Sequence, residues 1–125
     1  IASSWSYYQR QVNVVDTTAP TSALSALPET MSNPTFTLTW SGSDSGAGIA
    51  TYDVQVRDGA DGPWQDLLAD TTKITQEFTG EVGHTYYFRC RATDLVGNVE
   101  DWPNDEGDTY TYIKGFRVFL PMVLR

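Results

Sequence analysis

Three runs of the chain alternate between apolar and polar side chains, and this alternation constrains the fold more than any other feature. The runs cover residues 36–40, 52–57 and 86–92. Because successive side chains of a strand point to opposite faces, each run predicts a strand with one face on a core and the other in water. The predicted core side chains are Trp40, Tyr52, Val54, Tyr86, Phe88 and Cys90.

Clusters of Gly, Asp, Asn, Ser and Pro separate the predicted strands and indicate turns. Weaker patterns predict further strands near residues 21–27, 64–68, 74–78 and 110–118, and loops at 41–48, 58–63 and 94–98. A short helical turn at residues 64–69 is the one helix candidate. A chain of 125 residues has the size of one domain. About seven short strands joined by such turns predict an all-β antiparallel sandwich.

The two ends of the chain repeat each other. Residues 8–15 and 112–119 share the pattern Tyr, any residue, basic, any residue, apolar, any residue, Val, apolar. We interpret both as closing strands of one module type, with chance similarity between two β-type segments as the alternative. An orphan strand at residues 4–15 would pair with an open sheet edge of its own domain or with a neighbour, giving a strand-mediated dimer.

This interpretation divides the chain into three parts. Residues 1–17 are the closing strand of a truncated upstream module plus a linker, residues 18–113 are the domain, and residues 114–125 are a C-terminal extension or closing strand. The final Leu-Pro is not followed by Thr-Gly, so covalent attachment to a cell wall by a sortase is not expected.

Several motifs are similar to those of bacterial fibronectin type III and Ig-like repeats. Residues 16–21 resemble the start of such repeats, Trp40 resembles their core tryptophan, and residues 83–92 are similar to their Gly-Thr-x-Tyr segment. Residues 94–98 resemble their Asp-x-x-Gly-Asn turn. The resemblance covers about residues 16–113 and implies a fibronectin type III-like sandwich. It also implies that Tyr86 occupies the tyrosine-corner position, with its hydroxyl bonded to nearby backbone.

The chain has too few reactive side chains for the common catalytic sites, so we do not expect an enzyme. His84 and Cys90 are the only residues of their types, and on one strand they would lie roughly 20 Å apart. They therefore cannot form a nucleophile and base pair, and two such residues are too few to hold zinc. No Gly-x-Ser-x-Gly elbow or phosphate-binding loop occurs. We predict no catalytic residue and no organic cofactor.

The formal net charge of −8 limits the partners of the chain. A surface this negative repels nucleic acids and anionic membranes. No apolar run approaches the roughly 20 residues of a membrane span. We expect an extracellular or cell-surface protein whose partners are neighbouring domains of the same chain.

Two ligand classes remain open. Residues 100–108 carry five carboxylates, and Asp101, Asp105, Glu106 and Asp108 are candidate calcium ligands, with solvated loop charges as the alternative. Trp64, Tyr87 and Trp102 are candidate aromatic platforms for carbohydrate. Their alternative role is to fill the edges of a small core or a junction with a neighbouring module.

The sequence therefore favours a non-catalytic spacer or docking module at the C-terminal end of an extracellular multidomain bacterial protein. The resemblance by itself implies a fold and no particular ligand, because this fold hosts many functions. The first alternative is a carbohydrate or surface-adhesion module that uses exposed aromatics. The second is a linker that calcium stiffens.

Overall fold

The computed structural model describes residues 17–115, and this part of the chain forms eight strands and no helix. The strands are β1 (Thr21–Leu24), β2 (Thr30–Met31), β3 (Thr35–Ser43), β4 (Ile49–Asp58), β5 (Gln65–Thr71), β6 (Thr75–Thr79), β7 (Thr85–Asp94) and β8 (Thr109–Ile113). The predictions about residues 4–15, about the repeated ends and about the C-terminal tail lie wholly or largely outside the described residues.

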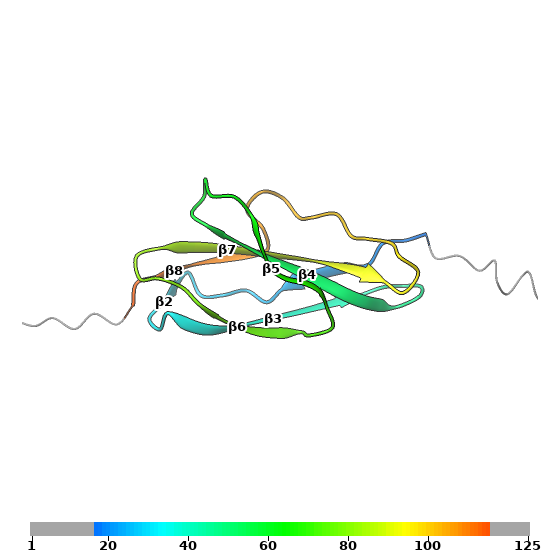
Figure 1. The fold of residues 1–125 in the computed structure, drawn as a ribbon, viewed down its shortest axis with the longest axis horizontal. Helices are drawn as coiled ribbons and strands as arrows, with labels where there is room; N and C mark the ends of the chain where they lie inside the picture. The colour runs from blue at the N-terminus through cyan, green and yellow to red at the C-terminus, as the bar shows by residue number, and fades with distance from the viewer. Residues whose placement is uncertain (1–16, 116–125) are drawn as a thin grey trace, which may run out of the picture.

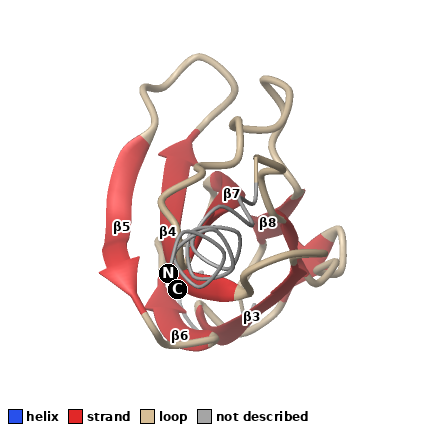
Figure 2. Ribbon diagram, turned by 90° about the vertical axis from the view of Figure 1, so that its right-hand side faces the viewer, coloured by secondary structure: helices blue, strands red, loops and turns tan. Residues whose placement is uncertain are grey.

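The strands form two sheets that face each other (Figures 1 and 2). One sheet has the order β1-β3-β6 and the other the order β2-β8-β7-β4-β5. All neighbours pair antiparallel except β2 and β8, which pair parallel over two residues. The predicted all-β sandwich is confirmed. Its eighth strand is the two-residue β2, which is too short to show any alternation in the sequence.

The core lies between the two sheets. All six side chains predicted for it are buried, together with Leu24, Leu38, Ala92 and Ile113. Phe78 joins the core from β6, with its ring centre 5.0 Å from those of both Tyr86 and Phe88. Each large apolar side chain buried in this way stabilises the fold by about 1.5–3 kcal/mol. Most of the buried side chains lie on β3, β4 and β7, so these alternating strands supply most of the stabilising burial.

One open alternative is decided and one local prediction is wrong. The sequence offered both a strand at residues 64–68 and a helical turn at residues 64–69, and the strand is confirmed. Residues 65–69 belong to β5, because β4 offers them a row of backbone partners such as Val54 opposite Leu68. The loop predicted at residues 41–48 is shorter, because β3 continues to Ser43, which pairs with Thr21 of β1. In both places pairing with a neighbouring strand outweighs the local preference of the residues.

Two loop motifs have the geometry that the resemblance implies. The Tyr86 hydroxyl accepts a hydrogen bond of 2.8 Å from the backbone N–H of Glu81, which confirms the tyrosine corner. The buried Asp94 carboxylate accepts hydrogen bonds from the backbone N–H groups of Val96 and Asn98 and from the Asn98 side chain. Gly97 completes this turn with a φ of 97°, which favours glycine.

The described chain begins and ends at opposite ends of the long axis (Figure 1). The blue start of the described chain lies beside the end of β7, and the orange end of the chain lies beside the start of β7. Strand β7 spans ten residues, so about 30 Å separate its two ends. The chain therefore crosses the whole length of the sandwich between entry and exit.

Candidate functional site

Arginine and aromatic side chains contact one another along the outer face of the five-stranded sheet. Alternate residues of β4 and β7 point away from the core on this face. Strand pairing places Asp53 opposite Arg91, Gln55 opposite Arg89, and Arg57 opposite Tyr87. Two tryptophans from outside the strands, Trp64 and Trp102, lie over the same face within reach of these arginines.

These side chains form a continuous stack that we call the ladder. In order, its members are Tyr110, Tyr87, Arg57, Trp64, Arg89, Trp102 and Arg91. The tyrosine ring centres are 5.5 Å apart. The five distances from a guanidinium carbon to a ring centre lie between 4.2 and 4.8 Å. Such cation–π contacts are worth about 0.5–2 kcal/mol each, depending on their exposure.

Two loops bring the tryptophans onto the sheet. Trp64 directly precedes β5, after a turn in which the N–H of Gly62 bonds to the carbonyl of Gly59. Trp102 lies on the segment between β7 and β8, which is fastened to β7 by the N–H groups of Glu100 and Asp108.

Gly107 allows these two loops to come close together. A Cβ atom at this position would lie 2.6 Å from the Phe88 carbonyl oxygen and 2.9 Å from the Trp64 ring. Its φ of 79° is also in the range that favours glycine.

Hydrogen bonds to β4 side chains fix two of the three arginines. The Nε atom of Arg89 donates to the Gln55 side chain at 2.8 Å, and the Nε atom of Arg91 donates to Asp53 at 2.9 Å. The Nε atom of Arg57 is buried without a hydrogen-bond partner. Partial burial, together with the positive charge of Arg57, lowers the pKa of Arg89 below its ordinary value. The ladder therefore holds like charges together, against their mutual repulsion.

The structure brings together the three residues predicted for carbohydrate. Trp64, Tyr87 and Trp102 all belong to the ladder, and Tyr87 lies on the polar face of β7 as its position in the alternation indicates. However, guanidinium groups already lie at stacking distance over these rings, where a sugar would have to lie. The carbohydrate assignment stays a prediction.

Sequence analysis missed the arginines of this site. Arg89 and Arg91 follow Tyr87 at the two-residue spacing of one strand face, so this pattern could have identified them. Their contacts with Trp64 and Trp102 have no local signal, because they depend on strand register and on the path of two loops.

Two carboxylates of the acidic segment close one edge of the sandwich. Glu100 accepts hydrogen bonds from the backbone and hydroxyl of Ser22 on β1, at 3.0 and 2.6 Å, and from the N–H of Ala92 on β7, at 3.0 Å. Asp108 accepts from the N–H groups of Leu24 and Cys90, at 3.2 and 3.1 Å. Together they join β1 of one sheet to β7 of the other.

The structure gives the four predicted calcium ligands different surroundings. Asp108 holds strand amides, whereas Asp101, Asp105 and Glu106 are exposed. Within residues 17–115 no three acidic, histidine or cysteine side chains gather closely enough to hold a metal ion. A calcium site built from these residues therefore stays a prediction.

The remaining titratable candidates have partners of their own. His84 Nδ1 lies 2.9 Å from Asp58, and its Nε2 lies 3.5 Å from Glu81. Burial raises the pKa of the Cys90 thiol to about 12, so it is protonated at neutral pH. His84 lies just before β7 and Cys90 lies in the core, as their positions in the sequence predict.

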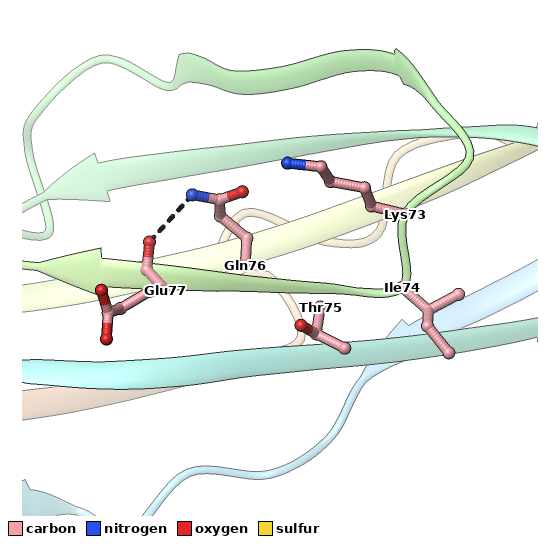
Figure 3. Close-up of a pocket in the computed structure, with 5 residues that line it drawn as sticks. All are labelled: Lys73, Ile74, Thr75, Gln76 and Glu77. Carbon is pink, nitrogen blue, oxygen red and sulfur yellow. Dashed lines mark hydrogen bonds between the residues drawn. The ribbon is translucent and has the colours of Figure 1, made fainter.

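The surface carries several open hollows, and one of about 250 Å³ adjoins the ladder at Tyr110. One of about 460 Å³ is lined by Lys73, Ile74, Thr75, Gln76 and Glu77, at the edge where β6 begins (Figure 3). The Gln76 side-chain amide donates to the Glu77 carbonyl there, at 3.1 Å. Among the described residues β6 pairs only with β3, so this hydrogen bond satisfies a backbone carbonyl at a sheet edge.

Comparison with known proteins finds similar structures and no match in sequence. No protein-family model matches the chain. No curated protein matches it either.

Two solved structures of similar fold come from a bacterium and from human muscle. An Fn3-like protein from Clostridium thermocellum has a TM-score of 0.50 and 17% identity, over 79% of this chain and 95% of its own. A titin module from human cardiac muscle has a TM-score of 0.50 and 20% identity, over 72% of this chain and 86% of its own.

A third structure, the kinase region of twitchin from C. elegans, has a TM-score of 0.43 and 20% identity. It matches 61% of this chain, which spans only 14% of that protein. The Clostridium protein and the titin module share the sandwich described above with this chain. The chain therefore has the fold of a fibronectin type III-like module.

Proposed function

We propose that this chain is a non-catalytic module that spaces and docks neighbouring domains of an extracellular bacterial protein. The observation that carries this proposal is the position of the two ends of the described chain, at opposite ends of the long axis (Figure 1). A domain inserted into a chain in this way holds the segments before and after it about one domain length apart.

The surroundings of the reactive side chains support a role without catalysis. Cys90 is buried, with a pKa of about 12, and His84 bonds to Asp58 rather than to a nucleophile. The hollow at the start of β6 is wide open to solvent and offers no enclosed reaction site. Within residues 17–115 no helix is long and apolar enough to cross a membrane.

A distance measurement across the module tests the spacing role. Thr17→Cys and Lys114→Cys place nitroxide labels at exposed positions near the two ends. Cys90 can stay, because its burial and its raised pKa protect it from labelling reagents. We expect a single narrow distance distribution, measured by pulsed electron paramagnetic resonance, with its centre beyond about 30 Å. A broad distribution, or one centred at a much shorter distance, would contradict a spacer.

The unlabelled protein tests the two alternatives. A glycan array tests the carbohydrate prediction, and a thermal melt with calcium or with a chelator tests the calcium prediction. A glycan signal that Trp102→Ala abolishes would make this module an adhesion domain. A calcium-dependent rise in melting temperature that Asp105→Asn removes would make it a stiffened linker.

A further inference from the structure

We propose that the ladder docks an acidic segment of a partner protein, whose carboxylates bind the outer edges of the Arg57 and Arg89 guanidinium groups. This inference rests on the docking part of the function proposed above. It assigns that docking to one face of the module and gives the partner a defined chemistry.

The free donors of the arginines carry the proposal. Arg89 uses only its Nε atom, toward Gln55, and Arg57 uses no hydrogen-bond donor toward any residue of the described chain. Arg91 makes the single ion pair of an arginine within residues 17–115. The Nη groups of Arg57 and Arg89 therefore have no protein acceptor there. A planar guanidinium with two free NH₂ groups is well suited to bind a carboxylate.

The distribution of charge points to an acidic ligand of limited size. Residues 17–115 contain five lysine and arginine side chains, and three of them, Arg57, Arg89 and Arg91, lie in the ladder. Because Arg91 is paired with Asp53, the local positive charge comes mainly from Arg57 and from Arg89, whose pKa burial lowers and the nearby Asp105 raises in part. The whole chain nevertheless carries a net charge of −8, which repels long polyanions. A short stretch of a protein with a few carboxylates fits both the local positive charge and the overall negative charge.

The ladder is also rigid before any partner arrives. Ring contacts at 4.2–4.8 Å and the inner hydrogen bonds of Arg89 and Arg91 hold long side chains that would otherwise sample many rotamers. A partner then loses little binding free energy to ordering these side chains. Trp, Tyr and Arg, which make up the whole ladder, are also the residues enriched at interface hot spots.

The same geometry favours a peptide over a sugar as the occupant. A sugar would stack on the faces of Trp64 and Trp102, and each of these rings already has two guanidinium groups within 4.7 Å of its centre. A carboxylate needs only the guanidinium edges, so it can bind without disturbing the stack.

The test uses the full chain, labelled with ¹⁵N, and synthetic peptides as probes. An extended peptide of about twelve alternating Glu and Ser residues, ~40 Å long, is titrated while NMR follows the Trp64 and Trp102 indole N–H signals. A peptide with Gln in place of Glu is the neutral control. We expect saturable shifts confined to the ladder and to its strands β4 and β7, with the Glu peptide alone, and weaker binding at higher salt.

Matched variants separate the ladder from general charge effects. We expect Arg57→Gln to weaken the Glu peptide about threefold to tenfold, and Lys73→Gln, the same charge change away from the ladder, to have no such effect. Arg57→Lys keeps the charge without the planar group, and we expect it to lie between wild type and Arg57→Gln. If Arg57→Gln perturbs the fold, Arg57→Lys and the salt dependence of the wild type still test the proposal.

Three outcomes would overturn the proposal. Equal shifts with the Gln peptide would exclude carboxylate recognition, and shifts spread over the whole surface would exclude the ladder. Tighter binding of an oligogalacturonate of matched charge would assign the face to an acidic glycan instead of a protein. None of these outcomes changes the distance across the module, so the spacing role and this docking site can fail independently.

Discussion

The carboxylate of Glu100 accepts a hydrogen bond of 2.6 Å from the hydroxyl of Ser22, 78 residues earlier in the chain. The two residues belong to opposite sides of the sandwich, Ser22 to β1 of the three-stranded sheet and Glu100 to the loop that follows β7 of the other. A side chain in this position replaces backbone pairing at an edge where the two sheets meet. It also makes the loop between β7 and β8 part of the framework that supports Trp102.

We expect Glu100→Ala to destabilise the fold by about 2 kcal/mol or more, because it leaves two backbone N–H groups and a hydroxyl without their acceptor. Urea unfolding followed by tryptophan fluorescence measures the loss. The matched control is Asp101→Ala, which removes an exposed carboxylate from the next position and should cost less than about 0.5 kcal/mol. Equal effects of the two changes would show that Glu100 acts only through its charge.

We expect Trp102→Ala to lower the free energy of unfolding by about 1–3 kcal/mol, because the ring contacts both Arg89 and Arg91. Loss of the ring should also narrow the spread of arginine Nε–H signals in NMR spectra. Tyr112→Ala removes an exposed aromatic of the same sheet, and we expect a smaller effect from it. A larger loss at Tyr112 would contradict the structural role given to the ladder.

We expect Tyr86→Phe to cost about 1 kcal/mol, because it removes the acceptor of the Glu81 N–H and leaves the ring in the core. Hydrogen exchange at the Glu81 amide should become faster in this variant. Tyr87→Phe, a change of the same chemistry at the next residue, lies on the outer face and should have little effect on either measurement. Unchanged exchange in Tyr86→Phe would mean that the tyrosine corner contributes nothing to the order of this loop.

His84 should show a pH-dependent contribution to stability. The hydrogen bond with Asp58, and then the charges of Asp58 and Glu81, raise the pKa of His84 above its ordinary value of 6.5. A raised pKa in the folded state stabilises the fold fully below the ordinary value, and this contribution disappears as the pH rises through the raised pKa. An NMR titration of the imidazole ring should give a lower pKa in Asp58→Asn than in wild type.

The stability of the same pair of proteins provides a second check. The difference in unfolding free energy between wild type and Asp58→Asn should be larger at about pH 5.5 than at about pH 8.5. Glu81 is farther from the ring, at 3.5 Å, so Glu81→Gln should lower the His84 pKa less. A stability difference that grows with pH would contradict a raised His84 pKa in the folded protein.

Cys90 should be inert in the folded protein. Burial first, and then the nearby Asp108 and Glu100 carboxylates, raise the pKa of its thiol to about 12, while the Ser22 hydrogen bond lowers it. The stability that depends on a neutral thiol is full below the ordinary pKa of 9.0 and is lost as the pH rises toward about 12. We expect a thiol reagent at neutral pH to react only as fast as the protein unfolds, and therefore faster in urea. Rapid reaction without denaturant would contradict the burial of Cys90.

The sequence alone determines the long strands β3, β4 and β7 and the core residues that they carry, because both follow from a local rule. A residue's parity in an alternating run decides which face it occupies, so Trp40, Phe88 and Cys90 could be placed in the core, and Tyr87 outside it, without any structure. The tyrosine corner and the Asp94 turn could also be predicted from the sequence, because each is formed by residues close together in the chain.

The tertiary structure alone decided which distant side chains meet. In the sequence, the carboxylates of residues 100–108 are equally consistent with metal ligands and with solvated charges. In the structure, Glu100 and Asp108 instead accept hydrogen bonds from backbone N–H groups of β1 and β7. Likewise, the register of β4 against β7 aligned Arg57 with Tyr87, and two loops laid the tryptophans beside them. These contacts join residues far apart in sequence, and no local pattern encodes the register and loop paths on which they depend.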